Sequence, residues 1–142
     1  MTDEVREATA ADRAGIQRLL RELHGEAADA TTLPEIRQQA RTFVAGDGDG
    51  DGDEIVGVLV ATFVDYGHEP CGVVEELVVH PASRGSGTGA ALLAQCKSWL
   101  EALGAEVVFV SAIDEEAAEF YLHAGFTRCT GPWLWAAAGQ PA

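Results

Sequence analysis

The pattern of apolar and polar positions is clearest in the middle of the chain, where a strand is predicted to lead through a loop into a helix. Residues 73–79 read VVEELVV, and their apolar end, Leu77-Val78-Val79, is typical of a buried strand. Pro81 and three alternating glycines then predict a loop. The helix that follows places six side chains on one face: Leu92, Leu93, Cys96, Trp99, Leu100 and Leu103.

The N-terminal pattern predicts one short strand and two helices. Residues 4–8 fit an edge strand, and Thr9 with Asp12 has the form of a capping box that opens a helix. Four apolar positions of this helix have core spacing: Ile16, Leu19, Leu20 and Leu23. Pro34 suits the first turn of a second, shorter helix that extends to about Gln39.

Two strands are predicted next, at 42–45 and 55–64, on either side of an acidic glycine-rich segment. The segment, 46–54, resembles the first half of a calcium-binding EF-hand loop. The twelfth position of such a loop should be a bidentate glutamate, but it is Val58, and flanking helices are lacking. A solvated hairpin loop without metal is therefore the favoured interpretation.

The C-terminal pattern predicts a parallel strand, a helix and a closing hairpin. Residues 107–110, VVFV, are expected to lie parallel to the central strand because a helix connects the two. Asp114 is the predicted N-cap of a helix that contains Tyr121. Two short strands, 127–129 and 133–137, are predicted to pair across a Gly-Pro turn.

The composition indicates a single globular domain spanning residues 1–142. Mean hydropathy is +0.03, no apolar run is long enough for a membrane span, and the N-terminus lacks a signal-peptide pattern. A cytoplasmic protein without a membrane partner is therefore expected. Cys71, Cys96 and Cys129 are an odd number at wide spacings, which predicts reduced thiols and no zinc site.

The charge is strongly acidic and unevenly distributed. A net charge of −14 disfavours nucleic-acid binding, which needs a basic surface. No lysine or arginine occurs between Arg41 and Arg84. The same interval contains Asp65, Glu69, Glu75 and Glu76. If they line a cleft, it attracts cations; alternatively, the acidity only keeps the protein soluble. Both interpretations stay open.

A strand, glycine loop and helix in this order can present bare backbone N–H groups to an anion at the helix N-terminus. A Walker-type loop would end in Gly-Lys-Ser/Thr, but the chain has Gly89-Ala90-Ala91. A dinucleotide fingerprint fits in its letters, yet its glycines should follow the strand directly, and residues 80–84 intervene here. Too few residues follow for the remaining parallel strands of such a fold.

The third alternative covers the whole stretch. The loop Arg84-Gly85-Ser86-Gly87-Thr88-Gly89, preceded by a strand and His80-Pro81, resembles the acyl-CoA pyrophosphate loop of the GNAT superfamily of N-acyltransferases. A second block, 114–126, reads DEEAAEFYLHAGF and resembles the family's Asn-x-x-Ala-x-x-hydrophobic-Tyr-x-x-x-Gly-Phe motif. The two blocks have the order and separation found in that family.

The resemblance implies a fold and an activity. The fold is a single α/β domain with about four helices and a mixed, mostly antiparallel sheet that splays between two central parallel strands. The activity is direct transfer of an acetyl group from acetyl-CoA, as co-substrate, to a primary amine. The acidic interval favours a cationic small molecule or a peptide amine as acceptor. A homodimer is an open alternative, with Trp133 and Trp135 at the contact or in the core.

The resemblance also implies roles for particular residues. The loop Arg84–Gly89 would bind the pyrophosphate, and the main chain of Leu77, Val78 and Val79 would bind pantetheine and polarise the thioester. Tyr121 would protonate the leaving thiolate, since a phenol is protonated at neutral pH. Asp114 matches a family asparagine that contacts pantetheine, although an ionised carboxylate can only accept there.

Alternatives remain for the identity of the catalytic base and for the function of the protein. Glu75 aligns with a glutamate of polyamine-type family members and is the favoured base, but Glu76 or water alone could serve. Neighbouring strand residues point to opposite faces, so only one of the two can face the cleft unless a bulge intervenes. The rival function is a non-catalytic module that binds acyl-CoA as a sensor or assembly element.

Overall fold

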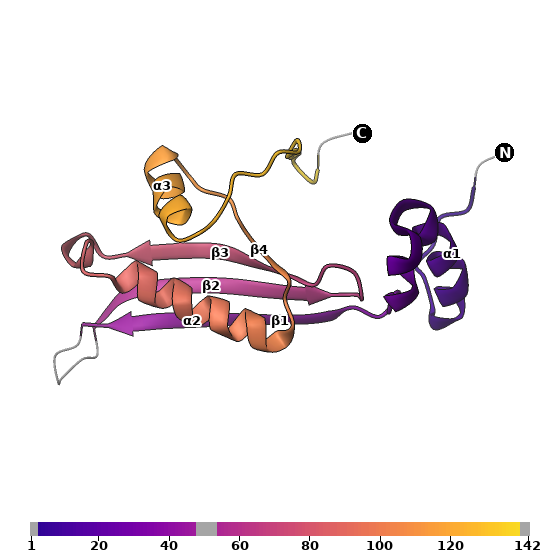
Figure 1. Ribbon diagram of the computed structural model, residues 1–142, viewed down its shortest axis with the longest axis horizontal. Coiled ribbons are helices and arrows are strands. Elements are labelled where there is room, and N and C mark those ends of the chain that lie inside the picture. Colours follow the sequence, from indigo (N-terminus) through magenta and orange to yellow (C-terminus); the bar gives the residue numbers. More distant parts are fainter. Residues whose placement is uncertain (1–2, 48–53, 140–142) are drawn as a thin grey trace. The chain divides into compact units, whose positions relative to one another are not determined.

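The computed structural model describes residues 3–47 and 54–139, which form two compact units, Met1–Ser111 and Ala112–Ala142 (Figure 1). The first unit contains a four-stranded sheet and two α-helices, and the second contains one α-helix. The segment 48–53, on which the calcium alternative depends, lies outside the described residues. The prediction of a single domain stays a prediction.

The sheet has the strand order β1-β2-β3-β4. Its strands are β1 (Arg37–Gly46), β2 (Ile55–Asp65), β3 (Cys71–Val79) and β4 (Val107–Val110). Both β1–β2 and β2–β3 are antiparallel, whereas β3 and β4 are parallel because α2 connects them. The mixed, mostly antiparallel sheet predicted from the sequence is therefore confirmed.

The predicted helix from Pro34 to Gln39 is wrong, because β1 begins at Arg37. The ladder between β1 and β2 is continuous from Arg37↔Asp65 to Ala45↔Gly57. Long-range pairing with an apolar partner strand has thus overridden the local helix signal. The described residues contain three α-helices in place of the four that were expected.

The helix α2 (Thr88–Leu103) lies along one face of the sheet, as Figure 1 shows. Five of its six predicted core residues are buried, and Leu103 is half-buried. Two glycines let the helix lie close to the strands. A Cβ atom at Gly57 would lie 2.9 Å from Leu92 Cδ1, and one at Gly72 would lie 2.5 Å from Leu100 Cδ1. The predicted central strand, loop and helix are confirmed.

Two arginines of β1 contact residues of α2. The Arg37 guanidinium donates a hydrogen bond to the carbonyl of Leu103 at 2.8 Å and lies over the Phe63 ring. It also pairs with Asp65 at 3.1 Å. The Arg41 guanidinium lies over Trp99, 5.1 Å from the ring centroid. Both cations of β1 are thus on the same face of the sheet as α2.

The N-terminal segment agrees with the sequence in part. The predicted strand at 4–8 is wrong, since residues 3–9 form no strand. The capping box is confirmed: the Thr9 N–H donates to the Asp12 carboxylate at 2.8 Å, and η1 (Ala10–Asp12) leads into α1 (Arg13–His24). The apolar positions of α1 do not form the expected core, because Leu19 and Leu23 expose 70% and 77% of their surface.

The second unit is built around α3 (Glu115–His123). As predicted, the Asp114 carboxylate caps this helix by accepting a hydrogen bond from the Ala117 N–H at 2.8 Å. Gly125, with φ +99°, follows the helix end. The predicted hairpin of 127–129 with 133–137 is not formed, and Trp133, Leu134 and Trp135 are exposed.

Candidate functional site

The segment between β3 and α2 is a tight turn followed by an open loop. The His80 N–H donates to Val56 O at 2.7 Å and closes the β2–β3 ladder. A single turn of 3-10 helix, η3 (Pro81–Ser83), then redirects the chain. Gly85 and Gly87 have φ values of +83° and +89°, a region that favours glycine. The chain enters α2 directly after Gly87.

This loop leaves several backbone donors without a partner. The N–H groups of Gly85, Ser86 and Gly87 have no hydrogen-bond acceptor within residues 3–47 and 54–139. The first turn of α2 adds further N–H groups, because its first backbone bond is Ala91 N–H to Gly87 O. A Cβ atom at Gly85 or Gly87 would meet nothing within 4 Å, so the space above the loop is open. Donors grouped at the N-terminus of a 16-residue helix are suited to an anion.

The side chains of the loop support this arrangement. Ser86 Oγ donates to the carbonyl of Ser83 and lies 3.2 Å from Thr88 Oγ1. Arg84 Nε donates to the carbonyl of Val79 at 3.1 Å. The two Nη groups of Arg84 have no partner in the described parts of the chain, and the residue is exposed. The loop therefore has a fixed cation beside its free N–H groups.

The edge of β3 next to this loop has no strand partner among the residues that the structure describes. The parallel strand β4 pairs with β3 only from Cys71↔Val107 to Val74↔Val110, whereas β3 continues to Val79. In an antiparallel ladder the backbone groups of alternate residues point to alternate edges. Since His80 N–H bonds to β2, the main chain of Val78 also faces β2, and that of Leu77 and Val79 faces away from it. The pairing of β3 with β4 thus ends at Val74, in agreement with the splayed sheet that the family resemblance implies.

A β-bulge interrupts β3 in front of this splay. Val60 pairs with Glu76, but its neighbour Ala61 pairs with Val74, so Glu75 is an extra residue. The Glu75 carboxylate accepts a hydrogen bond from Thr62 Oγ1 at 2.9 Å. Sequence reasoning missed Thr62, although a lone hydroxyl in the apolar run 55–64 is a detectable signal.

Tyr121 and Asp114, the other predicted site residues, lie in the second unit. Tyr121 is on α3 and exposes only 8% of its surface. Its ring packs edge-on against Phe120 and Phe126, with centroid distances of 5.1 and 5.4 Å. One carboxylate oxygen of Asp114 is already used for the helix cap.

Two cysteines and the possible metal-binding side chains are further candidate sites of chemistry. Burial raises the pKa of the Cys71 thiol, with Glu69 adding to the effect, and burial also raises the pKa of Cys96. Both thiols are therefore protonated and weak nucleophiles near neutral pH. Among the residues the structure describes, no three His, Cys, Asp or Glu side chains are grouped to hold a metal ion.

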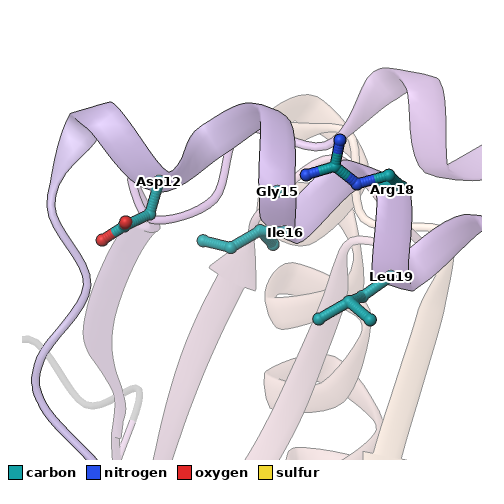
Figure 2. A pocket seen from close by; sticks show the side chains of 5 residues that line it. All are labelled: Asp12, Gly15, Ile16, Arg18 and Leu19. Atoms are coloured by element: carbon teal, nitrogen blue, oxygen red, sulfur yellow. The ribbon is translucent and has the colours of Figure 1, made fainter. Parts of the chain in front are cut away.

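A hollow of about 420 Å³ lies elsewhere, on the surface of α1 (Figure 2). It is lined by Asp12, Gly15, Ile16, Arg18 and Leu19. None of these is a predicted site residue, and Asp12 is already paired with Arg6 at 2.8 Å. No helix within the described ranges is long and apolar enough to cross a membrane.

Comparison with known proteins identifies the family. Residues 9–126 match the model of the acetyltransferase (GNAT) family, so the chain belongs to this family. Its members are acetyl-CoA-dependent N-acetyltransferases that act on an acceptor substrate. The predicted family, fold class and enzyme class are thus confirmed. No match was found among the curated proteins.

Solved structures with the same fold include proteins from several sources. A proposed acetyl transferase from Pyrococcus furiosus is 20% identical, with a TM-score of 0.58 over 94% of this chain and 83% of that one. An aminoglycoside acetyltransferase, HMB0005, from an uncultured soil metagenomic sample is 28% identical, with a TM-score of 0.52 over 60% of each chain. AtaTR, whose structure is bound with AcCoA, is 22% identical, with a TM-score of 0.53 over 65% of this chain and 61% of that one.

Proposed function

We propose that this acetyltransferase moves the acetyl group of acetyl-CoA directly to the primary amine of a cationic small molecule or peptide. The observation that supports acetyl-CoA binding most strongly is the group of unpaired N–H donors at Gly85, Ser86 and Gly87 beside the Arg84 guanidinium. A diphosphate can accept from several such donors at once and gains from the helix dipole. AtaTR, which shares the fold, was solved with AcCoA bound.

The splayed edge of β3 supports a position for the pantetheine arm. The backbone groups of Leu77 and Val79 face the edge that β4 has left, where an extended chain could pair with them as an additional strand. The Val79 carbonyl already accepts from Arg84, which leaves its N–H and both groups of Leu77. A backbone N–H in this row can polarise the thioester carbonyl. The main chain of Val78 faces β2 and takes no part in this proposal.

The charges on the sheet support a cationic acceptor. The bulge places both Glu75 and Glu76 on the face away from α2. On that face Glu76 pairs with Val60, and Glu75 accepts a hydrogen bond from Thr62. The arginines of β1 lie on the other face, so the described strands offer no cation near this carboxylate pair. HMB0005, which shares the fold, is an aminoglycoside acetyltransferase. A cationic amine is therefore the acceptor class that the local charge favours.

The reaction then proceeds in a ternary complex. Glu75 accepts a proton from the acceptor ammonium through a water molecule, and the neutral amine attacks the thioester carbon. The carbon–sulfur bond breaks as the carbon–nitrogen bond forms, Tyr121 gives its proton to the departing thiolate, and the phenolate is reprotonated by the second proton that the new amide nitrogen loses. Direct transfer involves no acyl-cysteine, and Cys71 and Cys96 are poor acyl carriers because burial raises the pKa of both thiols.

The test combines binding and turnover. Isothermal titration with acetyl-CoA should show binding, and NAD should show none. Release of free CoA should then be measured across polyamines, aminoglycosides, peptides and neutral amines, with the highest kcat/KM expected for the multiply charged ones. Failure to bind acetyl-CoA would exclude the proposal.

A single substitution separates an enzyme from a sensor. Tyr121→Phe should lower kcat while the affinity for acetyl-CoA stays unchanged, because only the proton donor is removed. Tyr66→Phe is the matched control, since Tyr66 is the other tyrosine of the chain. Wild-type binding without turnover on any amine would favour the non-catalytic alternative.

A further inference from the structure

The bulge in β3 brings two adjacent carboxylates to one face of the sheet. In a regular strand Glu75 and Glu76 would point to opposite faces. Here Glu76 pairs with Val60 and Val74 pairs with Ala61, so Glu75 is an extra residue between the two pairs. The side chains of the two residues at a bulge both point to the same side. Thr62 lies two positions after Val60 on β2 and therefore shares this face.

Only one of the two carboxylates is held in place. Thr62 Oγ1 donates to Glu75 Oε1 at 2.9 Å. The Glu76 carboxylate has no hydrogen bond or ion pair in the part of the chain that the structure describes. Both residues are exposed, so neither is fixed by packing. The hydroxyl of a neighbouring strand is thus the one group that distinguishes them.

From this contact we infer that Thr62 is a positioning residue, which holds the Glu75 carboxylate ready to accept the proton of the acceptor ammonium. The inference rests on the proposed acetyl transfer and assigns the base role to Glu75 and not to Glu76. In this step a nitrogen–proton bond of the ammonium breaks and the proton passes through water to Glu75. The neutral amine keeps the electron pair, and Glu75 becomes a carboxylic acid. Thr62 keeps its own proton throughout.

The chemistry of Thr62 suits this role. A β-branched side chain on a strand has a restricted χ1 angle, so the hydroxyl is already directed when the contact forms. A threonine hydroxyl has one proton to donate, and an ionised carboxylate only accepts. The bond therefore orients the Glu75 oxygen without a cation nearby that would compete with the acceptor ammonium. An arginine or lysine at position 62 would repel that ammonium.

The experiment compares Thr62→Val, Thr62→Ser, Glu75→Gln, Glu76→Gln and the double variant Thr62→Val/Glu75→Gln. Steady-state turnover is measured at saturating acetyl-CoA with the best amine of the acceptor screen. Valine keeps the shape of threonine without a donor, and serine keeps the donor. We expect kcat/KM for the amine to fall about tenfold in Thr62→Val and to stay within about twofold in Thr62→Ser. The affinity for acetyl-CoA should not change in either.

Two comparisons distinguish positioning from a structural effect. In the Glu75→Gln background, Thr62→Val should cause no further loss of kcat/KM, because the group through which it acts is absent. Thr42→Val is the matched control: Thr42 is exposed on β1, pairs with the same Val60 and should keep wild-type activity. The Tm of every variant is measured alongside.

The inference is overturned if Thr62→Val lowers activity equally with and without Glu75, or if serine fails to restore it. It also fails if Glu75→Gln keeps full activity while Glu76→Gln loses it, although acetyl transfer itself would then stand. Absence of acetyl-CoA binding in the wild type would overturn the proposed function as well. Failure of the inference appears in the amine turnover of the variants, whereas failure of the proposed function appears in acetyl-CoA binding by the wild type. The two failures can therefore be told apart.

Discussion

Gly87 offers the most direct test of the anion-binding loop, because the same helix provides a control. Gly87 precedes α2 with φ +89°, and Gly104 follows it with φ +92°. At both positions a Cβ atom would meet nothing within 4 Å. An alanine with positive φ costs about 1–2 kcal/mol, so Gly87→Ala and Gly104→Ala should lose similar stability. For a domain of this size this corresponds to a Tm lower by about 3–8 °C in each.

The two variants should differ in binding. A methyl group at Gly87 would occupy open space beside the loop, where we expect a phosphate oxygen to approach the free N–H groups to about 2.9 Å. Loss of a charge-assisted hydrogen bond there costs about 1.5–3 kcal/mol, which raises the Kd for acetyl-CoA by about 10- to 100-fold. Gly104 lies at the other end of α2, so Gly104→Ala should bind acetyl-CoA like the wild type.

The assay is isothermal titration with acetyl-CoA at a temperature well below both Tm values, so that folded protein is compared with folded protein. If Gly87→Ala binds within twofold of the wild type, the coenzyme does not rest on this loop. An equal weakening in Gly104→Ala would mean that the binding loss arises from general destabilisation, and the reasoning from the loop geometry would be refuted.

Three further predictions concern stability and thiol reactivity. Arg37→Met should lower the Tm by about 3–8 °C, since it removes an ion pair, a bond to the last turn of α2 and a cation–π contact, together about 1–2 kcal/mol; an unchanged Tm would contradict this. The pKa of Asp12 is lowered mainly by its hydrogen bond from Arg6, so this carboxylate stabilises the fold above its unfolded pKa of about 3.9 and less as the pH falls below it. The Tm difference between wild type and Asp12→Asn should accordingly shrink between pH 5 and pH 2, and a constant difference would be inconsistent. Iodoacetamide at pH 8 should label exposed Cys129 first, and mass spectrometry should find half-buried Cys71 and buried Cys96, whose pKa values are raised, modified last.

The elements that could be predicted from the sequence are those whose signal is local. Leu92, Cys96 and Leu100 repeat at helical spacing, and every one of them is buried in α2. The capping residues Thr9 and Asp114 also act within a few positions of themselves, and both caps are present. The strand, loop and helix that form the proposed coenzyme site are likewise predicted from local sequence signals.

What could not be predicted depends on partners far along the chain. Residues 37–39 look like the end of a helix locally, but they pair with β2 about 25 residues later, and the ladder decides their structure. The residues at 4–8 and 133–137 alternate like strands yet have no strand partner in the described residues. The contact of Thr62 with Glu75 depends on a register shift between β2 and β3, which no periodicity of either strand reveals.

Gly57 lies in the sheet directly beneath the start of α2, so the residue at this position affects the loop that precedes the helix. Besides Leu92, a Cβ atom there would lie 3.1 Å from Cγ2 of Thr88, the first residue of α2. Any larger residue at position 57 would push the helix start outward and carry the neighbouring turn of backbone with it. Affinity for the coenzyme should therefore be sensitive to a buried site that no ligand atom touches, and variants selected for tighter or weaker binding could arise on β2 as readily as in the loop itself.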